Sequence, residues 1–484
     1  MCLVASRSAF DPPGGGLIPA TAPTGPMEEA PASVDGSERL TRVAAGILGG
    51  LFLAHFIVLA TYAVNVPHWD EWDMLPADLR RIDWGWLFSW SNEHRPVLTR
   101  LEVFLSSRWG GWNVVTLQLV HFVFYGLLVL LVVRAARKAA PELPGWAAYG
   151  FSFFLLSAIA WEVHSWAATF CWTLSLFFFV IAAHCLFHET QGVRWLVAGA
   201  SSIVVAFFSN DVGLVAGLSL AAWFALFKLT RAWRRADGAG SAAREIGGLG
   251  VVLAIVGTVL LLAFHDYRKP LHHPALAFPD RSAFWTAFTN VTAHGFGFAT
   301  RSVALGLSCL ALALAPVAVE FWRRGLRVET RFWRSSALTL GIVGALAGIA
   351  VARGGFGPAT GKESRYAFVA IWLVPFTATL WSMAMRGSNR ARALVLAGLW
   401  AFCFLGFADD WNAKPYRHMA ERRRLGLECV REYYTKTGDG NCPAIYPAPI
   451  AAKLDLAARL HLSFYEDIRK SSAADVASST STAR

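Results

Sequence analysis

Charged residues are scarce in this sequence. Asp, Glu, Lys and Arg together make up 16% of the 484 residues, whereas hydrophobic residues make up 55%. An average soluble domain has about 25% charged residues. The scarcity of charge therefore excludes the two or three soluble domains that a chain of this length would otherwise suggest.

Short alternating apolar runs, which would indicate a β-barrel, are also few. Apolar runs recur instead at the scale of roughly 20 residues that a helix needs to cross a bilayer. We therefore predict an all-α polytopic membrane protein with about 11 transmembrane helices. The expected spans are 41–65, 112–133, 145–161, 167–187, 194–208, 212–229, 246–264, 301–321, 335–352, 367–385 and 393–408.

The N-terminal stretch lacks the basic-then-apolar order of a signal peptide. It is rich in Pro, Gly, Ala and Ser, so we expect residues 1–38 to be a disordered cytoplasmic tail, with Met27 as an alternative start. The expected organisation continues with a transmembrane domain at 39–408 and a small extracytoplasmic segment at 409–470. A second disordered tail is expected at 471–484.

The net charge of +11 does not indicate a nucleic-acid partner, because the basic residues fall mainly in short connections between apolar runs. Basic clusters follow the second, sixth, eighth and tenth expected spans, so all of them lie on one side of the membrane. By the positive-inside rule that side is the cytoplasm, which places the N-terminus inside and the C-terminus outside the cytoplasmic membrane. The clusters contain Arg134, Arg137, Lys138, Arg231, Arg234, Arg235, Arg323, Arg324, Arg327, Arg331, Arg334, Arg386, Arg390 and Arg392.

Cysteine is also infrequent, with seven in the chain. Cys429 and Cys442 both fall on the expected outer side, where an oxidising compartment would allow them to pair. The spacing alone does not decide whether they do. The other five cysteines fall in the N-terminal tail or in the spans, and we expect them to act as small apolar residues.

The stretch "VPHWDEWDMLP" follows the first span on the expected outer side. It contains Asp70, Glu71 and Asp73, interleaved with two tryptophans that anchor a segment at the membrane interface. A carboxylate at this low-dielectric boundary has a raised pKa and suits a general base. The alternative is a solvated acidic flank. His68 with Asp70 and Asp73 could form a weak divalent metal site, although their spacing matches no strong metal signature.

Two further outer segments carry cations, and in the second of them these stand against the positive-inside bias. In "SNEHRPVLTRLE", Glu93, His94 and Arg95 form a polar group in which the glutamate could hold the arginine toward a phosphate; an interfacial ion pair is the alternative. In "ARGGFGPATGKESRYAF", the cations and the neighbouring tyrosine suggest a bound phosphate or pyrophosphate, with lipid-headgroup anchoring as the alternative. The residues in this second segment are Arg353, Lys362, Arg365 and Tyr366.

Two short outer turns are polar as well. "AWEVHSW" places Glu162 and His164 between tryptophans, and "FFSNDVG" places Asn210 and Asp211 at a helix end. Ionisable residues at the edge of a membrane bundle are candidates for substrate binding. Helix capping by Asn210 or Asp211 is the alternative.

These features resemble the GT-C class of integral-membrane glycosyltransferases. "HWDEWD" stands where that class carries an acidic motif just after the first helix, and Asp70–Glu71 match the Asp-Glu pair common in its bacterial branches. The "SRY" at Ser364–Tyr366, after a Gly-rich turn, resembles the donor-phosphate-side arginine motif of related bacterial membrane proteins. "NEHR" and the polar turn at Trp161–Trp166 are also similar to features of this group. The resemblance covers roughly residues 41–410.

The resemblance implies a GT-C-like fold with interfacial helices in the first outer loop. It also implies inverting transfer of a hexose or pentose from a polyprenyl-phosphate donor to a hydroxyl of a lipid or cell-surface glycan. Asp70, with Glu71 as the alternate, would take the proton, and Arg365, with Arg353 or Lys362, would stabilise the leaving phosphate. A lipid phosphate is a good leaving group, so no cofactor is required, although a divalent metal could bind. Only about 75 residues follow the last span, which disfavours a polymeric acceptor.

Other functions would use the same kind of chain. A transporter or flippase of lipid-linked sugars would need ionisable residues at the bilayer midplane and often an internal repeat. Here the polar residues gather on one face and no clear repeat is present. A polymerase or ligase of lipid-linked glycans would differ only in its acceptor, and a non-catalytic membrane partner would share the fold. The expected partners are the lipid-linked donor, the acceptor and membrane lipids, without nucleic acid.

Overall fold

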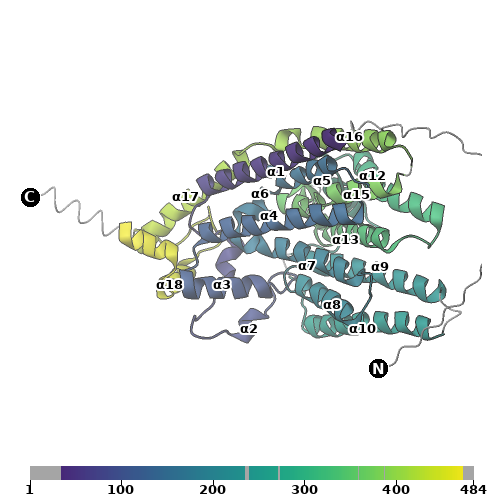
Figure 1. The fold of residues 1–484 in the computed structure, drawn as a ribbon. Coiled ribbons are helices and arrows are strands. Elements are labelled where there is room, and N and C mark those ends of the chain that lie inside the picture. Colours follow the sequence, from purple (N-terminus) through teal and green to yellow (C-terminus); the bar gives the residue numbers. More distant parts are fainter. Residues whose placement is uncertain are drawn as a thin grey trace, which may run out of the picture.

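The computed structural model describes residues 34–234, 239–270, 273–357, 359–385, 387–435 and 437–471. Within these ranges the chain forms helices joined by turns and contains no β-strand (Figure 1). The predicted all-α class is therefore confirmed. Helix α1 begins at Val34, so it takes in the last residues of the expected N-terminal tail. The rest of that tail, with Met27, and residues 472–484 lie outside the described ranges.

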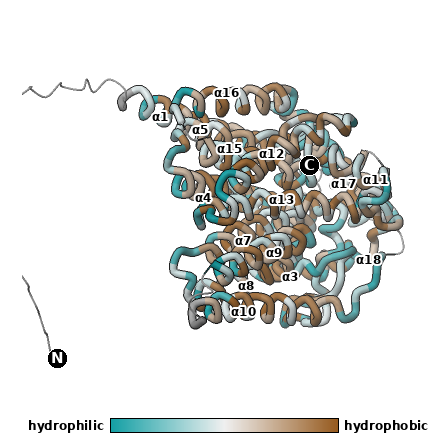
Figure 2. The backbone as a smooth tube through the Cα atoms, turned by 90° about the vertical axis from the view of Figure 1, so that its right-hand side faces the viewer, coloured by the Kyte–Doolittle hydropathy of each residue, from teal (hydrophilic) through white to brown (hydrophobic). Residues whose placement is uncertain are grey.

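Nine helices among the described residues are long and apolar enough to cross a membrane, and they coincide with nine of the expected spans. Figure 2 shows the apolar character along helices such as α10, with hydrophilic residues mainly where the chain turns. The chain is thus a polytopic membrane protein. The spans are built from α1 (Val34–Tyr62), α4 (Val114–Ala139), α5 (Gly145–Ser152) with η2 (Phe153–Leu156), η3 (Ala158–Ala160) and α6 (Trp161–Ser165), η4 (Ala167–Thr169) with α7 (Phe170–Leu186), α9 (Asp211–Arg234), α10 (Ala239–Phe264), α12 (Val303–Arg324), α13 (Thr330–Arg353) with η5 (Gly354–Phe356), and α14 (Ser364–Ala370) with α15 (Leu373–Ala384).

The two remaining expected spans are helices of a different kind. Helix α8 (Val193–Phe207) has 15 residues, a length of about 22 Å that is shorter than the roughly 30 Å hydrocarbon core. Helix α16 (Asn389–Gly406) has 18 residues, but Asn389, Arg390 and Arg392 make its first turn polar. The other elements are η1 (Trp69–Met74), α2 (Trp84–Leu87), α3 (Val97–Gly110), α11 (Ser282–His294), η6 (Thr360–Lys362), η7 (Ala408–Asp410), α17 (Lys414–Tyr434) and α18 (Ala451–Arg459).

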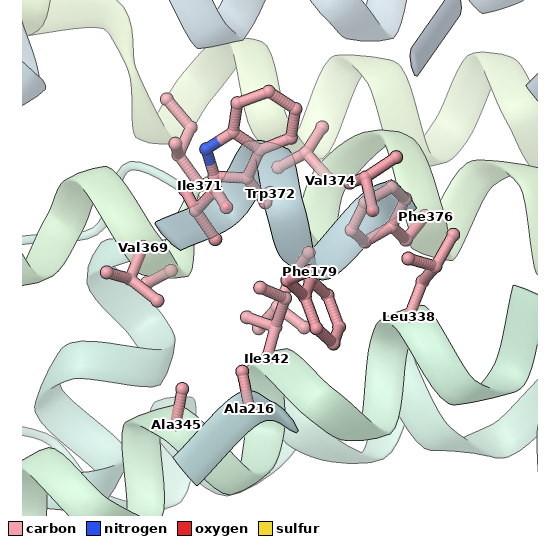
Figure 3. Close-up of a cluster of buried hydrophobic side chains, with 14 of the residues drawn as sticks. Phe179, Ala216, Leu338, Ile342, Ala345, Val369, Ile371, Trp372, Val374 and Phe376 are labelled. Carbon is pink, nitrogen blue, oxygen red and sulfur yellow. The ribbon is translucent and has the colours of Figure 1, made fainter. Parts of the chain in front are cut away.

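The core of the bundle lies where α7, α9, α13 and the α14–α15 segment meet. Phe179, Ile342 and Trp372 are buried there (Figure 3). Small residues on α13 allow this close packing, since a Cβ atom at Gly341 would lie 2.3 Å from the Phe179 ring. Close approach of backbones at small residues is a common basis of helix packing in membranes.

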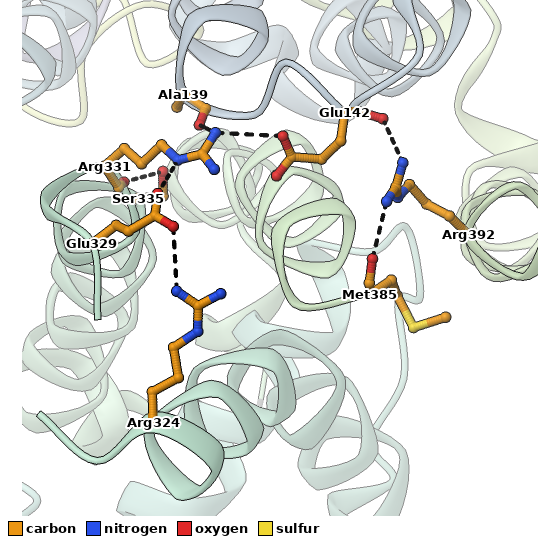
Figure 4. Close-up of polar contacts among 8 residues, drawn as sticks. All are labelled: Ala139, Glu142, Arg324, Glu329, Arg331, Ser335, Met385 and Arg392. Carbon is orange, nitrogen blue, oxygen red and sulfur yellow. Dashed lines mark hydrogen bonds and ion pairs between the residues drawn. The ribbon is translucent and has the colours of Figure 1, made fainter. Parts of the chain in front are cut away.

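Basic turns meet at one end of the bundle, which we call the basic end. Arg331, in the first turn of α13, donates to the carbonyl oxygen of Ala139, the last residue of α4, at 3.3 Å. It also pairs at 3.4 Å with Glu142 on the turn between α4 and α5 (Figure 4). Arg392 of α16 donates to the Glu142 carbonyl oxygen at 3.4 Å. These contacts confirm that the basic clusters after the second, eighth and tenth expected spans share one side.

The residues after α16 fold into a C-terminal lobe, residues 409–471, which contains α17, α18 and a last helical stretch at 463–471. This lobe lies at the opposite end of the bundle, near α3 (Figure 1). Cys429 and Cys442 form a disulfide within it, as the sequence allowed. The lobe shares a hydrophobic core with the first long loop, in which the Trp72 ring packs edge-on against Phe464 with the ring centroids 5.5 Å apart.

Candidate active site

A cavity of about 580 Å³ opens at the end of the bundle opposite to the basic end. Its walls come from η1, the turn before α3, the starts of α7, α9 and α14, the loop after α10 and the end of α13. Segments that are far apart in the sequence therefore meet around one space. The sequence-predicted residues that line it are Asp70, Glu93, His94, Asn210, Arg353, Arg365 and Tyr366.

Asp70 is the carboxylate that the first loop presents to this cavity. Trp69 has a left-handed backbone conformation, with φ of 49°, and starts the 3₁₀ helix η1 that carries Asp70. Among the described residues, the Asp70 carboxylate has no hydrogen-bond donor or ion-pair partner. Partial burial and the charge of Asp73 raise the pKa of Asp70, and the charges of Arg365, His94 and Arg353 partly oppose this shift. An unpartnered carboxylate with a raised pKa is suited to accept a proton.

Glu71 points into the protein rather than into the cavity, because successive residues of a 3₁₀ helix are about 120° apart. It is fully buried. Its carboxylate accepts hydrogen bonds from the backbone N–H groups of His68 at 2.6 Å, Ala167 at 2.6 Å and Ala168 at 3.3 Å, and it pairs with Arg423 of α17 at 3.5 Å. Burial raises the pKa of Glu71, whereas Arg423 and the three N–H groups favour its charged form. Glu71 thus fastens η1 to the bundle and is not placed as an alternate to Asp70.

Asp73 turns from η1 toward the C-terminal lobe. It pairs with Lys453 and accepts a hydrogen bond from the Tyr446 hydroxyl at 3.0 Å. His68 is buried beside Trp166, and burial lowers its pKa to about 2. The expected divalent site is not formed, because no group of three or more His, Cys, Asp or Glu side chains with metal-binding geometry occurs in the described part of the chain.

Glu93 joins the first loop to the end of α13. One of its oxygens accepts from Nη2 of Arg353 at 2.8 Å, and the other pairs with His273 of the loop after α10. The sequence suggested that Glu93 would hold Arg95, and this was wrong. Arg95 pairs with Asp266 and lies over the Trp90 ring at 4.5 Å from its centroid. Arg95 consequently does not line the cavity.

Arg365 lies in the first turn of α14 and is positioned by two glutamates. Its guanidinium pairs with Glu363, and its backbone N–H donates to Oε2 of Glu162 at 3.0 Å. The backbone N–H of Glu162 donates in turn to the Ser364 hydroxyl at 3.0 Å. Glu162 therefore supports Arg365 from outside the cavity wall. Tyr366, next in sequence, is buried with its ring centroid 6.0 Å from that of Trp172.

Two other predicted residues lie away from the cavity lining. The ammonium of Lys362 donates to the carbonyl oxygen of Ala299 at 3.2 Å. His164 is buried in an aromatic cluster, with its ring centroid 4.7 Å from Tyr125 and 5.3 Å from His55. Apolar surroundings of this kind give a histidine a packing role.

Asn210 caps a helix, which is one of the two roles that the sequence left open. Its side-chain oxygen accepts from the backbone N–H of Val212 at 3.0 Å, which caps the start of α9, and its amide lies 3.6 Å from Sγ of Cys171. It also lines the cavity beside Asp211.

Sequence reasoning missed the contribution of the loop after α10. Tyr267, Lys269 and His273 all line the cavity. Lys269 is exposed and has no ion pair among the described residues. The only signal was the polar run "HDYRKP" directly after an apolar span, on the same expected side as Asp70.

No protein-family model matches the sequence, and no curated protein matches it. The Asp70 carboxylate on η1 shares the cavity with Arg353 and Arg365. Such an arrangement can deprotonate a hydroxyl while it holds an anion.

Proposed function

We propose that this protein is an integral-membrane glycosyltransferase of the GT-C kind, acting at the outer face of the cytoplasmic membrane. It would transfer a sugar from a polyprenyl-phosphate donor to a hydroxyl of a lipid or cell-surface glycan. The observation that carries the proposal is the unpartnered Asp70 carboxylate, which lines the same cavity as Arg353 and Arg365.

The proposed step balances in one displacement. The Asp70 carboxylate takes the proton of the acceptor hydroxyl, whose oxygen attacks the anomeric carbon of the sugar. The bond between that carbon and the phosphate oxygen breaks, so the configuration inverts and the lipid phosphate leaves with its negative charge. Arg365 stabilises that charge, and Arg353, held by Glu93, adds to the positive potential of the cavity.

The cavity wall also suits a lipid-linked donor. Val212 and Val215 of α9 and Ala345 and Ile349 of α13 line it. Ala345 lies eight residues before Arg353 on the same helix, about 12 Å deeper along the span. A lipid chain can therefore follow the apolar wall while its phosphate stays near the arginines. A flippase would need ionisable residues along a path through the membrane, whereas this cavity gathers them at one end.

The test is sugar transfer in membranes, with a panel of polyprenyl-phosphate hexoses and pentoses and with released polyprenyl phosphate as the product. Asp70→Asn should lower the rate about 10²- to 10⁴-fold, the range for loss of a general base. Arg365→Ala should lower it about 10²- to 10³-fold. The matched control is Asp73→Asn, which removes the charge of a side chain of the same 3₁₀ helix that does not line the cavity. The asparagine keeps an oxygen that can accept hydrogen bonds from Tyr446 and Lys453, so this variant should stay within a few fold of wild type at neutral pH. Equal losses in the two Asp variants, or full activity of Asp70→Asn, would contradict the proposal.

A further inference from the structure

A second cavity, of about 390 Å³, opens at the basic end of the bundle, remote from the candidate active site. Its walls come from the last turns of α9, the turn between α12 and α13, the first turn of α13 and Glu189 after α7. The cavity also brings the basic cluster of α9 next to that of the α12–α13 turn. The chemistry proposed above does not involve it.

Two arginines give this cavity its charge. Arg231 pairs through Nε with Glu245 at 3.1 Å, and Glu245 also pairs with the buried Lys228 at 2.7 Å, so the Arg231 side chain is held in place. The Phe227 ring supports the Arg231 guanidinium at 5.3 Å from its centroid. Arg234 is exposed and has no ion pair within the described ranges. Glu189 is the acidic residue in the lining.

The remaining lining residues are suited to a phosphate ester. The hydroxyl groups of Thr230 and Thr330 are further polar groups of the wall, and the buried Trp333 contributes an apolar surface. Arginines bind phosphate oxygens with paired hydrogen bonds, and hydroxyl groups can complete the contact.

Exposed tryptophans indicate the depth of this cavity in the membrane. Trp233 is 73% exposed next to Arg234, and Trp322 is 91% exposed on the last turn of α12. Exposed indole rings near the end of apolar helices mark the headgroup level of a bilayer. The cavity thus lies where the phosphates of one leaflet are found, and the positive-inside rule assigns that leaflet to the cytoplasmic side.

We propose that this cavity binds the phosphate of an anionic phospholipid from the leaflet at the basic end. Basic pockets between transmembrane helices on the cytoplasmic side are suited to anionic headgroups. Arg231 and Arg234 bind the phosphate, and the apolar wall formed by Phe227 and Trp333 lies against the glycerol and the upper part of the acyl chains. The inference does not depend on the proposed glycosyl transfer.

The test measures lipid binding to the purified full chain in detergent, by native mass spectrometry with phosphatidylglycerol and with phosphatidylcholine. The double variant Arg231→Gln/Arg234→Gln should weaken phosphatidylglycerol binding about 25-fold, since each surface cation contributes about a factor of five. Arg234→Gln alone should weaken it about five-fold, and because that side chain is exposed and unpaired, this variant also serves if the double variant fails to fold. The matched control is Arg134→Gln/Arg137→Gln, which removes the same charge from exposed positions of α4 at the same end.

Three outcomes would overturn the inference. The first is an equal loss of phosphatidylglycerol binding in the two double variants, which would show only a general attraction to the basic end. The second is phosphatidylcholine binding as tight as that of phosphatidylglycerol. The third is competition by glycerol 3-phosphate at the same concentration as the lipid, which would assign the cavity to a soluble phosphate ester. Weak competition by glycerol 3-phosphate supports the lipid.

Discussion

The buried pair of Glu71 and Arg423 offers a stringent test of how the candidate active site is held. Both side chains are almost fully buried, at 0% and 1% exposed. A Glu71→Met change leaves the Arg423 guanidinium, which cannot lose its proton, without its partner. Breaking a buried pair in this way costs about 3–5 kcal/mol of unfolding free energy. At about 2.1 cal/mol/K of unfolding entropy per residue, a chain of 484 residues loses about 1 °C per kcal/mol, so the expected fall in midpoint is about 3–5 °C.

The Arg423→Met change should have opposite effects on stability in the wild type and in the Glu71→Met variant. In the wild type, Arg423→Met removes the partner of a buried carboxylate and lowers stability. In the Glu71→Met background, the same change removes an uncompensated buried charge and should raise stability. The double variant should remain below wild type, because the N–H groups of Ala167 and Ala168 and of His68 still lack the acceptor that Glu71 supplied, at about 1–3 kcal/mol per buried group.

The measurement is the temperature at which half of the detergent-solubilised protein leaves the monodisperse peak in size-exclusion chromatography. All four proteins are heated for the same time in the same detergent, so that irreversible loss affects them alike. Equal falls for Arg423→Met in both backgrounds would refute the reasoning, since additivity indicates that the two side chains do not interact. A Glu71→Met variant as stable as wild type would refute it as well.

Three further predictions concern pH, packing and the C-terminal lobe. In the proposed reaction Asp70 acts as the deprotonated base, and its pKa is raised partly by the charge of Asp73. Sugar-transfer activity should therefore fall as pH falls through that pKa, and Asp73→Asn should move the acid limb of the pH–rate profile to lower pH. An unmoved acid limb would mean that Asp73 does not act on Asp70. Gly306→Ala should destabilise by about 1–3 kcal/mol, because its Cβ would lie 2.3 Å from the Thr289 carbonyl oxygen. The control is Gly398→Ala in α16, whose Cβ would have no atom within 4 Å and which should not lower the melting temperature. Replacing both Cys429 and Cys442 by serine should lower the melting midpoint by about 3 °C, because the disulfide closes a loop whose constraint contributes about 3 kcal/mol. An unchanged midpoint would refute that estimate.

The spans were predictable because a single physical demand governs them. A segment in hydrocarbon must satisfy its own backbone, so each helix is visible as a continuous apolar run. The location of the basic turns at one end of the bundle was also predictable, because basic residues in short connections follow the positive-inside rule. Helix α8 was expected as a span because its composition is apolar, and the structure has a helix of the same 15-residue length, which is shorter than the hydrocarbon core is thick.

The residues of the site were predictable where an ionisable side chain occurs next to an apolar span on the expected outer side. Asp70, Arg353 and Arg365 were found as ionisable residues on the expected outer side, and all three line the cavity. The sequence could not show that Asp70 faces the cavity whereas Glu71 is buried. That difference depends on a 3₁₀ turn and on Arg423, which lies more than 350 positions later. The pairing of Glu93 with Arg353 rather than Arg95 depends in the same way on the packing of distant helices.

The contacts of the C-terminal lobe set an order of events during synthesis. The acidic loop leaves the ribosome early, but two of its contacts are with residues made much later. Asn65 donates a hydrogen bond to Ser463, 398 positions later, and Asp73 forms an ion pair with Lys453. A chain that ended before residue 409 would contain every residue of the candidate active-site cavity and would still lack Arg423, Tyr446 and Lys453, which hold η1. The candidate active site is therefore completed only when the last part of the polypeptide has been made, and partly made chains already in the membrane have the cavity residues without the means to place Asp70.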